Sequence, residues 1–333
     1  MIVHSPLDAK QVFRDISVFA QPIVTRSIVE LAITVVPFMI LWVATWAALA
    51  SGYWLGLLLT IPAGGLLLRL FVIQHDCGHG SLFRSRKTND WVGRALSVLT
   101  LTPYDSWRKA HAKHHATSGN LEKRGVGDID TLTLDEYRAK SRLQRLVYRI
   151  YRNPLLLFGV GPAFTFFVRH RFPLGSRAGG WRVWLPTMST NAAILAAAAL
   201  IIWNIGFALF IAVHLPIALI AATGGIWLFY VQHQFEHTNW DRDADWNFHD
   251  AALYGSSYYT LPGVLRWVTG DIGIHHVHHL SCRIPFYRLP QVLAAHPALT
   301  TINRLSIRES FAAMRLTLWD QDRRRLLSFA EAR

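Results

Sequence analysis

Cysteine and charged residues are scarce in this sequence of 333 residues. It holds two cysteines, Cys77 and Cys282, which excludes a disulfide framework and a thiolate metal cage. Charged residues make up 17% of the chain, whereas ~25% is usual for soluble domains. Apolar residues make up 52%, and the mean hydropathy is +0.23. These values exclude disordered, collagen-like and coiled-coil proteins. They indicate a single membrane-embedded domain over residues 1–333.

Acidic residues are also in short supply. The 34 Lys and Arg outnumber the 21 Asp and Glu, so that the net charge is +13 and the pI is near 10.2. Thirty of these 34 basic residues lie in segments 74–182 and 232–333. This asymmetry is the positive-inside pattern of membrane proteins. It explains the charge without nucleic acid, for which the chain has no binding motif.

Four apolar runs are long enough to cross a ~30 Å hydrocarbon core as helices. The connections within each pair are short, which predicts two helical hairpins with their long polar flanks on one side. The sequence therefore predicts an all-α integral membrane fold of four transmembrane helices under a helical cap, with both termini and the cap cytosolic. The expected spans are about 31–50, 53–73, 184–203 and 206–231, and the expected cap segments are 74–182 and 232–333.

Two further segments need separate interpretations. Residues 154–168 form an apolar stretch of 15 residues bounded by Arg152 and Arg169. This stretch is short for a span, so we expect it to be interfacial or re-entrant. The charged tail from Arg304 onward is predicted to form a solvated amphipathic helix.

Eleven of the 16 histidines fall into four short groups, at 75–79, 111–115, 233–237 and 275–279. The first group reads HxxxH, the second and fourth contain HxxHH, and the third follows the last span. Positions i, i+3 and i+4 share one face of a helix, so each group can direct its imidazoles at one point. An isolated histidine such as His214, within the fourth span, is more simply a helix-packing residue. The four groups together predict a metal centre.

The donor set narrows the choice of metal. Imidazole suits iron, copper, zinc and nickel. The chain has no HExxH, which excludes the zinc protease arrangement, and no Glu-x-x-His, which excludes a carboxylate-bridged di-iron bundle. Eight or nine nitrogen ligands exceed the capacity of one octahedral ion, so a pair of iron ions fits best. Each ligand ring also needs an acceptor for its second nitrogen, and the nearby candidates are Asp76, Asp105, Asp128, Asp130, Glu236 and Asp271.

The sequence around the histidines resembles that of a known family. HDCGHGS at 75–81, HAKHHATSGNLEKRGVGDID at 111–130, YVQHQFE at 230–236 and WVTGDIGIHHVHHLSCRIP at 267–285 are similar to the membrane fatty acid desaturase and hydroxylase superfamily. Within it they look most like the bacterial acyl-lipid desaturases of the Δ12 (ω-6) type, over residues 30–300. The resemblance implies a bacterial inner-membrane location and a metal ligand set of His75, His79, His111, His114, His115, His233, His275, His278 and His279.

Three positions near the ligand set have no assigned role. The HxxHH spacing selects His275 and leaves His276 as an extra imidazole. His237 stands where the subgroup usually has an acidic residue, and Asp271 stands where it usually has Asn.

The resemblance further implies that the protein inserts a cis double bond into a lipid acyl chain, using O₂ and two electrons. The chain has no GxGxxG after a strand and no haem or iron–sulfur domain, so a separate ferredoxin-like or cytochrome b5-like donor is expected on its basic face. Several aromatic residues could line a tunnel for the acyl chain: Trp107, Trp227, Trp240, Trp246, Tyr258, Tyr259 and Trp267. Two alternatives stay open. One is a hydroxylase or ketolase acting on an alkane, carotenoid or sphingoid chain, and the other is a metal transporter.

Overall fold

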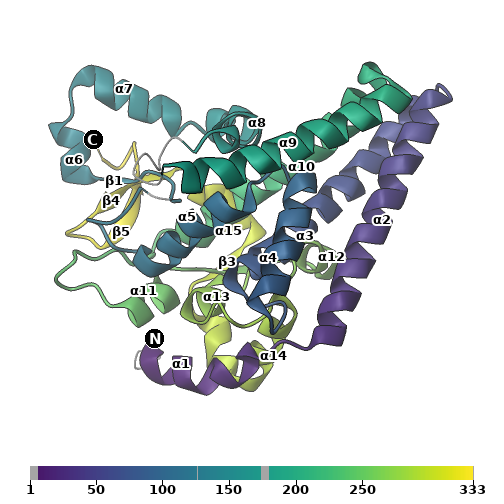
Figure 1. The fold of residues 1–333 in the computed structure, drawn as a ribbon. Coiled ribbons are helices and arrows are strands. Elements are labelled where there is room, and N and C mark those ends of the chain that lie inside the picture. The colour runs from purple at the N-terminus through teal and green to yellow at the C-terminus, as the bar shows by residue number, and fades with distance from the viewer. Residues whose placement is uncertain (1–6, 126, 174–179, 333) are drawn as a thin grey trace.

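The computed structural model describes residues 7–125, 127–173 and 180–332. Four of its helices are long and apolar enough to cross a membrane, as expected. They are α2 (Val24–Ala50), α3 (Thr60–His79) with the turn before it from Trp54, α9 (Trp181–Ile205) and α10 (Phe207–His233). Figure 1 shows these helices on one side of the molecule and the remaining elements gathered at one of their ends.

The two hairpins meet through α3 and α10. Gly64 on α3 permits this approach, because a Cβ atom there would lie 2.6 Å from Cγ2 of Ile220. Both helices run past the predicted ends of their spans, 73 and 231, and finish at His79 and His233. The two rigid, packed helices therefore carry histidines directly into the cap.

A buried ion pair joins α2 and α3. Arg69 pairs with Glu30, and each side chain is only 2% exposed. The Arg69 guanidinium also donates to the carbonyl of Trp267 and to Oγ1 of Thr34. The charge that interrupts the second apolar run thus ties the first hairpin to the segment that precedes the last histidine group.

The cap is mostly helical. Its helices are α1 (Ala9–Ile16), α4 (Arg86–Leu99), α5 (Tyr104–Thr117), α6 (Leu134–Ala139), α7 (Arg142–Tyr151), α8 (Gly161–Phe167), α11 (Phe248–Tyr254), α12 (Gly263–Val268), α13 (His275–Leu280), α14 (Leu289–Ala295) and α15 (Ile307–Ala313). Segment 154–168 forms a π-helical turn, η3 (Leu156–Val160), and then α8. Its interfacial or re-entrant placement stays a prediction.

The prediction of an amphipathic helix from Arg304 onward is wrong. The tail instead contains β3 (Arg304–Ser306), α15, β4 (Leu316–Asp320) and β5 (Arg325–Ser328). Strand β4 pairs in parallel with β1 (Leu132–Thr133) and antiparallel with β5, while β3 pairs in parallel with β2 (Tyr258–Thr260). Trp319, Leu326 and Leu327 are buried at this sheet. Strand β4 pairs with residues about 185 positions earlier and β3 with residues about 46 positions earlier, and local helical periodicity does not reveal such partners.

Candidate metal centre

Four helices deliver all nine predicted ligands to two compact groups. The first cluster consists of His75, His79, His111, His115 and His278, and the second cluster of His114, His233, His275 and His279. Within each cluster the candidate ligand nitrogens lie within 4.8 Å of one another. The expectation that each histidine group directs all its rings at one point is wrong for α5 and α13, which contribute to both clusters. On each of these helices the i and i+4 rings share a cluster, whereas the i+3 ring, His114 or His278, lies on an adjoining face and joins the other cluster.

In the first cluster the Nε2 atoms form a continuous series of contacts. Nε2 of His79 lies 3.2 Å from that of His75 and 3.1 Å from that of His111. Nε2 of His115 lies 3.1 Å from that of His111 and 3.2 Å from that of His278. A neutral imidazole has one N–H, so shared hydrogens cannot satisfy the whole series. Five lone pairs directed at a common point fit a bound cation.

The second cluster gives the sharper test of fit. Nδ1 of His114 donates to Asp128, and Nδ1 of His233 lies 3.4 Å from the carbonyl oxygen of Gly255, which can only accept. The Nε2 atoms of both rings must therefore carry lone pairs, yet they lie 3.1 Å apart. Nε2 of His279 is buried without a hydrogen-bond partner among the described residues. These nitrogens suit a metal ion that accepts their lone pairs.

Burial keeps five rings of the cap helices neutral, as metal ligands must be. Loss of hydration lowers the pKa values of five of these histidines well below the usual range, and neighbouring imidazoles lower them further. They are His111, His115, His275, His278 and His279. The second cluster is wholly buried, whereas His79 and His111 leave the first cluster partly exposed.

Two of the six candidate acceptors contact rings of the predicted ligands. Asp128 accepts from His114, and Oδ1 of Asp76 lies 3.2 Å from Nδ1 of His75. The expectation is wrong for three others, because nearby arginines neutralise them instead: Asp105 pairs with Arg94, Glu236 with Arg325, and Asp271 with Arg266. Asp130 instead accepts from Arg152 at 3.0 Å through its backbone carbonyl.

The extra imidazoles lie outside both clusters. Nε2 of His276 is 3.0 Å from the carbonyl oxygen of Leu299, which leaves this ring on the far side of α13. His237 is exposed. The structure thus brings together the residues that the HxxHH spacing selects and excludes His276 and His237.

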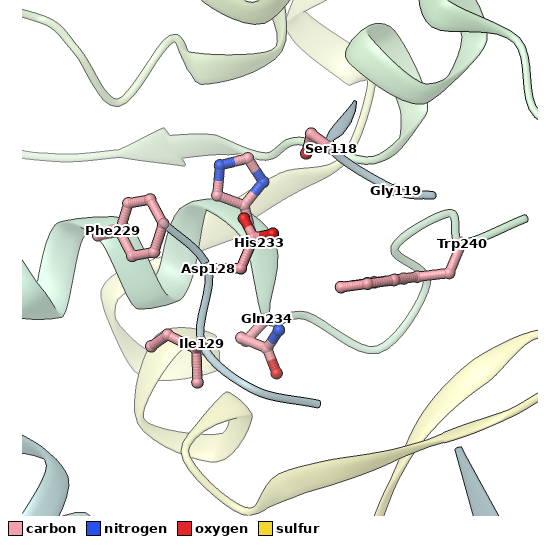
Figure 2. Close-up of a pocket in the computed structure, with 8 residues that line it drawn as sticks. All are labelled: Ser118, Gly119, Asp128, Ile129, Phe229, His233, Gln234 and Trp240. Atoms are coloured by element: carbon pink, nitrogen blue, oxygen red, sulfur yellow. The ribbon is translucent and has the colours of Figure 1, made fainter. Parts of the chain in front are cut away.

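Two of the seven predicted tunnel residues lie against the clusters. The Trp107 ring stacks on that of His111, with centroids 4.6 Å apart and planes at 16°. Trp240 lines a small pocket beside the second cluster, shown in Figure 2, together with Asp128 and His233. Trp267 instead lies over the Arg69 guanidinium, 4.3 Å from it. A role for these rings in lining a tunnel stays a prediction.

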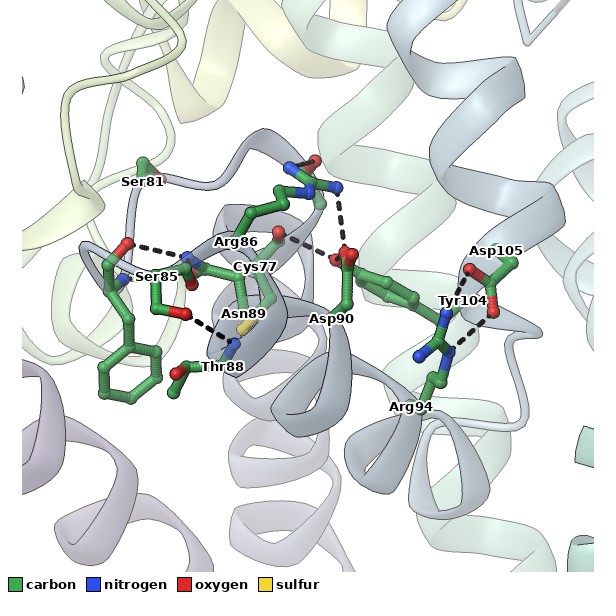
Figure 3. Close-up of polar contacts among 12 residues, drawn as sticks. Cys77, Ser81, Ser85, Arg86, Thr88, Asn89, Asp90, Arg94, Tyr104 and Asp105 are labelled. Carbon is green, nitrogen blue, oxygen red and sulfur yellow. Dashed lines mark hydrogen bonds and ion pairs between the residues drawn. The ribbon is translucent and has the colours of Figure 1, made fainter.

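A polar network fixes α4 and α5 against the first histidine group (Figure 3). Arg86 donates to the carbonyl of Gly78 at 3.0 Å and pairs with Asp90. The hydroxyl of Tyr104 lies 2.8 Å from both the Cys77 carbonyl oxygen and Asp90 Oδ1. The backbone of Cys77 and Gly78, between His75 and His79, is thereby held in place.

Arg152 supports the site, a role that the sequence does not predict. Its buried guanidinium donates to the carbonyls of Asp130 and Leu316, and to side-chain oxygens of Thr131, Tyr230 and Gln234. It joins the loop that carries Asp128, the helix end that carries His233, and strand β4. The boundary charge before an apolar stretch was the one signal in the sequence.

Comparisons with known proteins agree with this geometry. A family model described as "Fatty acid desaturase" matches residues 44–310. A fatty acid desaturase of Bacillus subtilis is 42% identical over 320 residues, which cover 96% of this chain and 90% of the relative. An sn-1 oleoyl-lipid 12-desaturase of Synechocystis sp. is 31% identical over 74% of this chain and 71% of the relative. An sn-1 acyl-lipid omega-3 desaturase (ferredoxin) of the same organism is 28% identical over 70% and 64%, respectively.

Proposed function

Because this chain belongs to the fatty acid desaturase family and is a membrane-bound fatty acyl desaturase, we propose that its nine clustered histidines hold two iron ions, one in each cluster. The observation that supports this proposal is the facing pair of lone-pair nitrogens on His114 and His233, repeated as a series of Nε2 contacts in the first cluster. When bound, the iron pair supplies the O₂-derived oxidant that an unactivated methylene requires.

The protein residues position and insulate this centre. The imidazole Nε2 atoms are the ligands, and Asp76 and Asp128 hold the rings of His75 and His114 in the required tautomer. The enclosed second cluster excludes water, while the partly exposed edge at His79 and His111 is the side open to small molecules.

The substrate is an acyl chain of a membrane lipid, consistent with the acyl-lipid names of two relatives. Partition of an acyl chain into the bilayer is favourable by ~0.8 kcal/mol per methylene, so the membrane itself concentrates the substrate. Two hydrogens leave adjacent methylenes to form the double bond. With two external electrons and two protons, one O₂ becomes two waters. The relatives reported above are all desaturases, which favours this outcome over hydroxylation or metal transport.

The electrons come from a separate ferredoxin-type or cytochrome b5-type protein. One Synechocystis relative carries ferredoxin in its name. Segments 74–182 and 232–333 carry 30 of the 34 basic residues, which suits an acidic donor. The same excess of basic residues orients the cap and both termini toward the cytosol of a bacterial inner membrane.

The decisive experiment expresses the chain in a host without polyunsaturated lipids and profiles the fatty acid methyl esters. The native chain is expected to add a double bond, whose position gives the regiochemistry, and His278→Ala is expected to add none. His276→Ala is the matched control, since this neighbouring ring lies outside the clusters, and it should retain product. A folded, metal-loaded native chain with the lipid profile of the empty vector would contradict the proposal.

The metal is tested by elemental analysis of protein purified from iron-supplemented cells. Two irons per chain are expected in the native protein and in His276→Ala. Zinc at both sites, unchanged by iron supplementation, would contradict the assignment to iron.

A further inference from the structure

Helix α7 presents an apolar face that no other part of the described chain covers. Leu143, Leu146, Val147 and Ile150 are 70%, 53%, 59% and 53% exposed, respectively. Their spacing of three, four and seven residues places all four on one side of the helix. Contiguous exposed apolar surface of this kind marks a protein or membrane contact.

The opposite face of α7 is firmly held by the cap. The hydroxyl of Tyr148 donates to the Thr317 carbonyl at 2.5 Å and accepts from the Leu132 backbone N–H at 3.1 Å. Tyr151 accepts from the Asp130 N–H at 3.1 Å. The apolar face is therefore fixed outward and is not free to turn into the core.

The apolar surface continues toward the spans. Leu155, Val160 and Phe164, in the following segment, are also exposed. That segment packs on α10, where Thr223 donates to the Phe158 carbonyl at 3.3 Å and the Phe158 ring lies 5.1 Å from that of Trp227. In Figure 1, α8 and then α7 extend outward from the end of α9 that faces the cap. The exposed face thus joins the membrane-facing surface at the level of the span ends.

We propose that α7 is an interfacial helix seated in the lipid leaflet on the cap side of the membrane. Its four apolar side chains lie among the upper acyl methylenes. Arg142, exposed on one flank of this face, lies at the lipid phosphates, so that anionic lipid deepens the contact. The cap side of the helix holds Asp130 and Leu132, which follow Asp128 in the same loop, so seating α7 fixes the height of the second cluster above the acyl chains. This proposal depends on the membrane embedding of the chain and not on the identity of the metal or the donor.

The test measures the depth of a spin label by collision with O₂ and with a water-soluble nickel chelate. The background is Cys282→Ala, because Cys77 is buried. The label is placed at Leu146→Cys, with Asp322→Cys as an exposed cap control and Leu195→Cys as an exposed span control. In phosphatidylglycerol–phosphatidylcholine vesicles, the Leu146 label is expected to be shielded from nickel and to lie between the two controls in depth.

Two results would overturn the proposal. Nickel accessibility equal to that of the Asp322 label would place the face in water. Spin–spin broadening that disappears on dilution with unlabelled chain would assign the face to a second copy. The charge is tested separately. Phosphatidylglycerol should deepen the label in the native background and not in Arg142→Gln, and equal deepening in both would exclude the arginine–phosphate contact. None of these readouts needs turnover, so failure of the iron or donor proposal leaves them interpretable.

Discussion

The carboxylate of Asp128 accepts a hydrogen bond from Nδ1 of His114. This bond leaves the lone pair of His114 Nε2 facing the corresponding nitrogen of His233 at 3.1 Å. Asp128, which lies on a loop, thereby determines that Nε2 is the nitrogen of His114 available to a metal.

Replacing this acceptor should weaken metal binding without removing a ligand. In Asp128→Asn the amide can donate to Nδ1 and so favour the wrong tautomer of His114, and loss of such an acceptor typically reduces metal affinity by about 10–100-fold. Competition with a chelator measures the change. Asp130→Asn is the control, because Asp130 uses its backbone carbonyl in this region, and equal affinity in both variants would contradict the role of Asp128.

Removing a ligand of the second cluster should empty one site and leave the other. His233→Ala is expected to lower the metal content from two ions per chain to about one, because the first cluster does not use His233. Elemental analysis of folded protein measures this content, and the fatty acid profile should lose its product. A variant that retains both ions would argue against His233 as a ligand.

The buried ion pair between the first two spans should respond asymmetrically to mutation. Glu30 contacts Arg69 and also Arg26, at 2.6 Å, so Arg69→Leu leaves Glu30 a partner. Glu30→Leu leaves the Arg69 charge buried, and an unpaired buried charge costs about 3–5 kcal/mol. Thermal unfolding in detergent should show a larger loss for Glu30→Leu than for Arg69→Leu, with the double variant less destabilised than Glu30→Leu. The reverse order would exclude a stabilising role for the Arg26 contact.

The contact between α4 and Tyr104 leaves no room for a methyl group. A Cβ atom at Gly93 would lie 2.2 Å from Cε2 of Tyr104, whose ring is fully buried. Gly93→Ala should therefore destabilise the cap by about 1–3 kcal/mol through overpacking, seen as a lower Tm. Gly263→Ala, where no atom of the described residues lies within 4 Å of the new carbon, should be close to neutral.

Acid should destabilise the protein partly through His170. Burial, aided by Arg171 and Arg169, lowers the pKa of His170 from 6.5 to about 3. The unfolded chain therefore binds a proton at His170 below about pH 6.5, whereas the folded chain binds it only below about pH 3. The free energy of unfolding consequently falls with falling pH, by at most about 1.4 kcal/mol per pH unit. His170→Phe should reduce the loss of Tm between about pH 7 and 5, while His237→Phe, at an exposed position, should not. Equal pH slopes for the native chain and His170→Phe would rule out this contribution.

The sequence predicted the spans and histidine groups well because both depend on local spacing. Apolar length fixes a helix that must satisfy its backbone within hydrocarbon, and the HxxHH spacing fixes which rings share a face. The same reasoning failed for the tail after Arg304, where β4 depends on β1, about 185 residues earlier. It also failed for Asp105, Glu236 and Asp271, because their proximity to the histidines in sequence did not reveal the arginines that pair with them.

The sequence alone determined the membrane class, the two hairpins and the identity of the clustered imidazoles, since each follows from composition or short-range periodicity. The tertiary structure alone decided how the nine rings divide into two clusters, which carboxylates orient them, and where Arg152 connects loop, helix and strand. Several of these relationships join residues far apart in the chain, such as His114 with His233 and Arg152 with Leu316. They depend on the packing of α3 against α10, which no local pattern encodes.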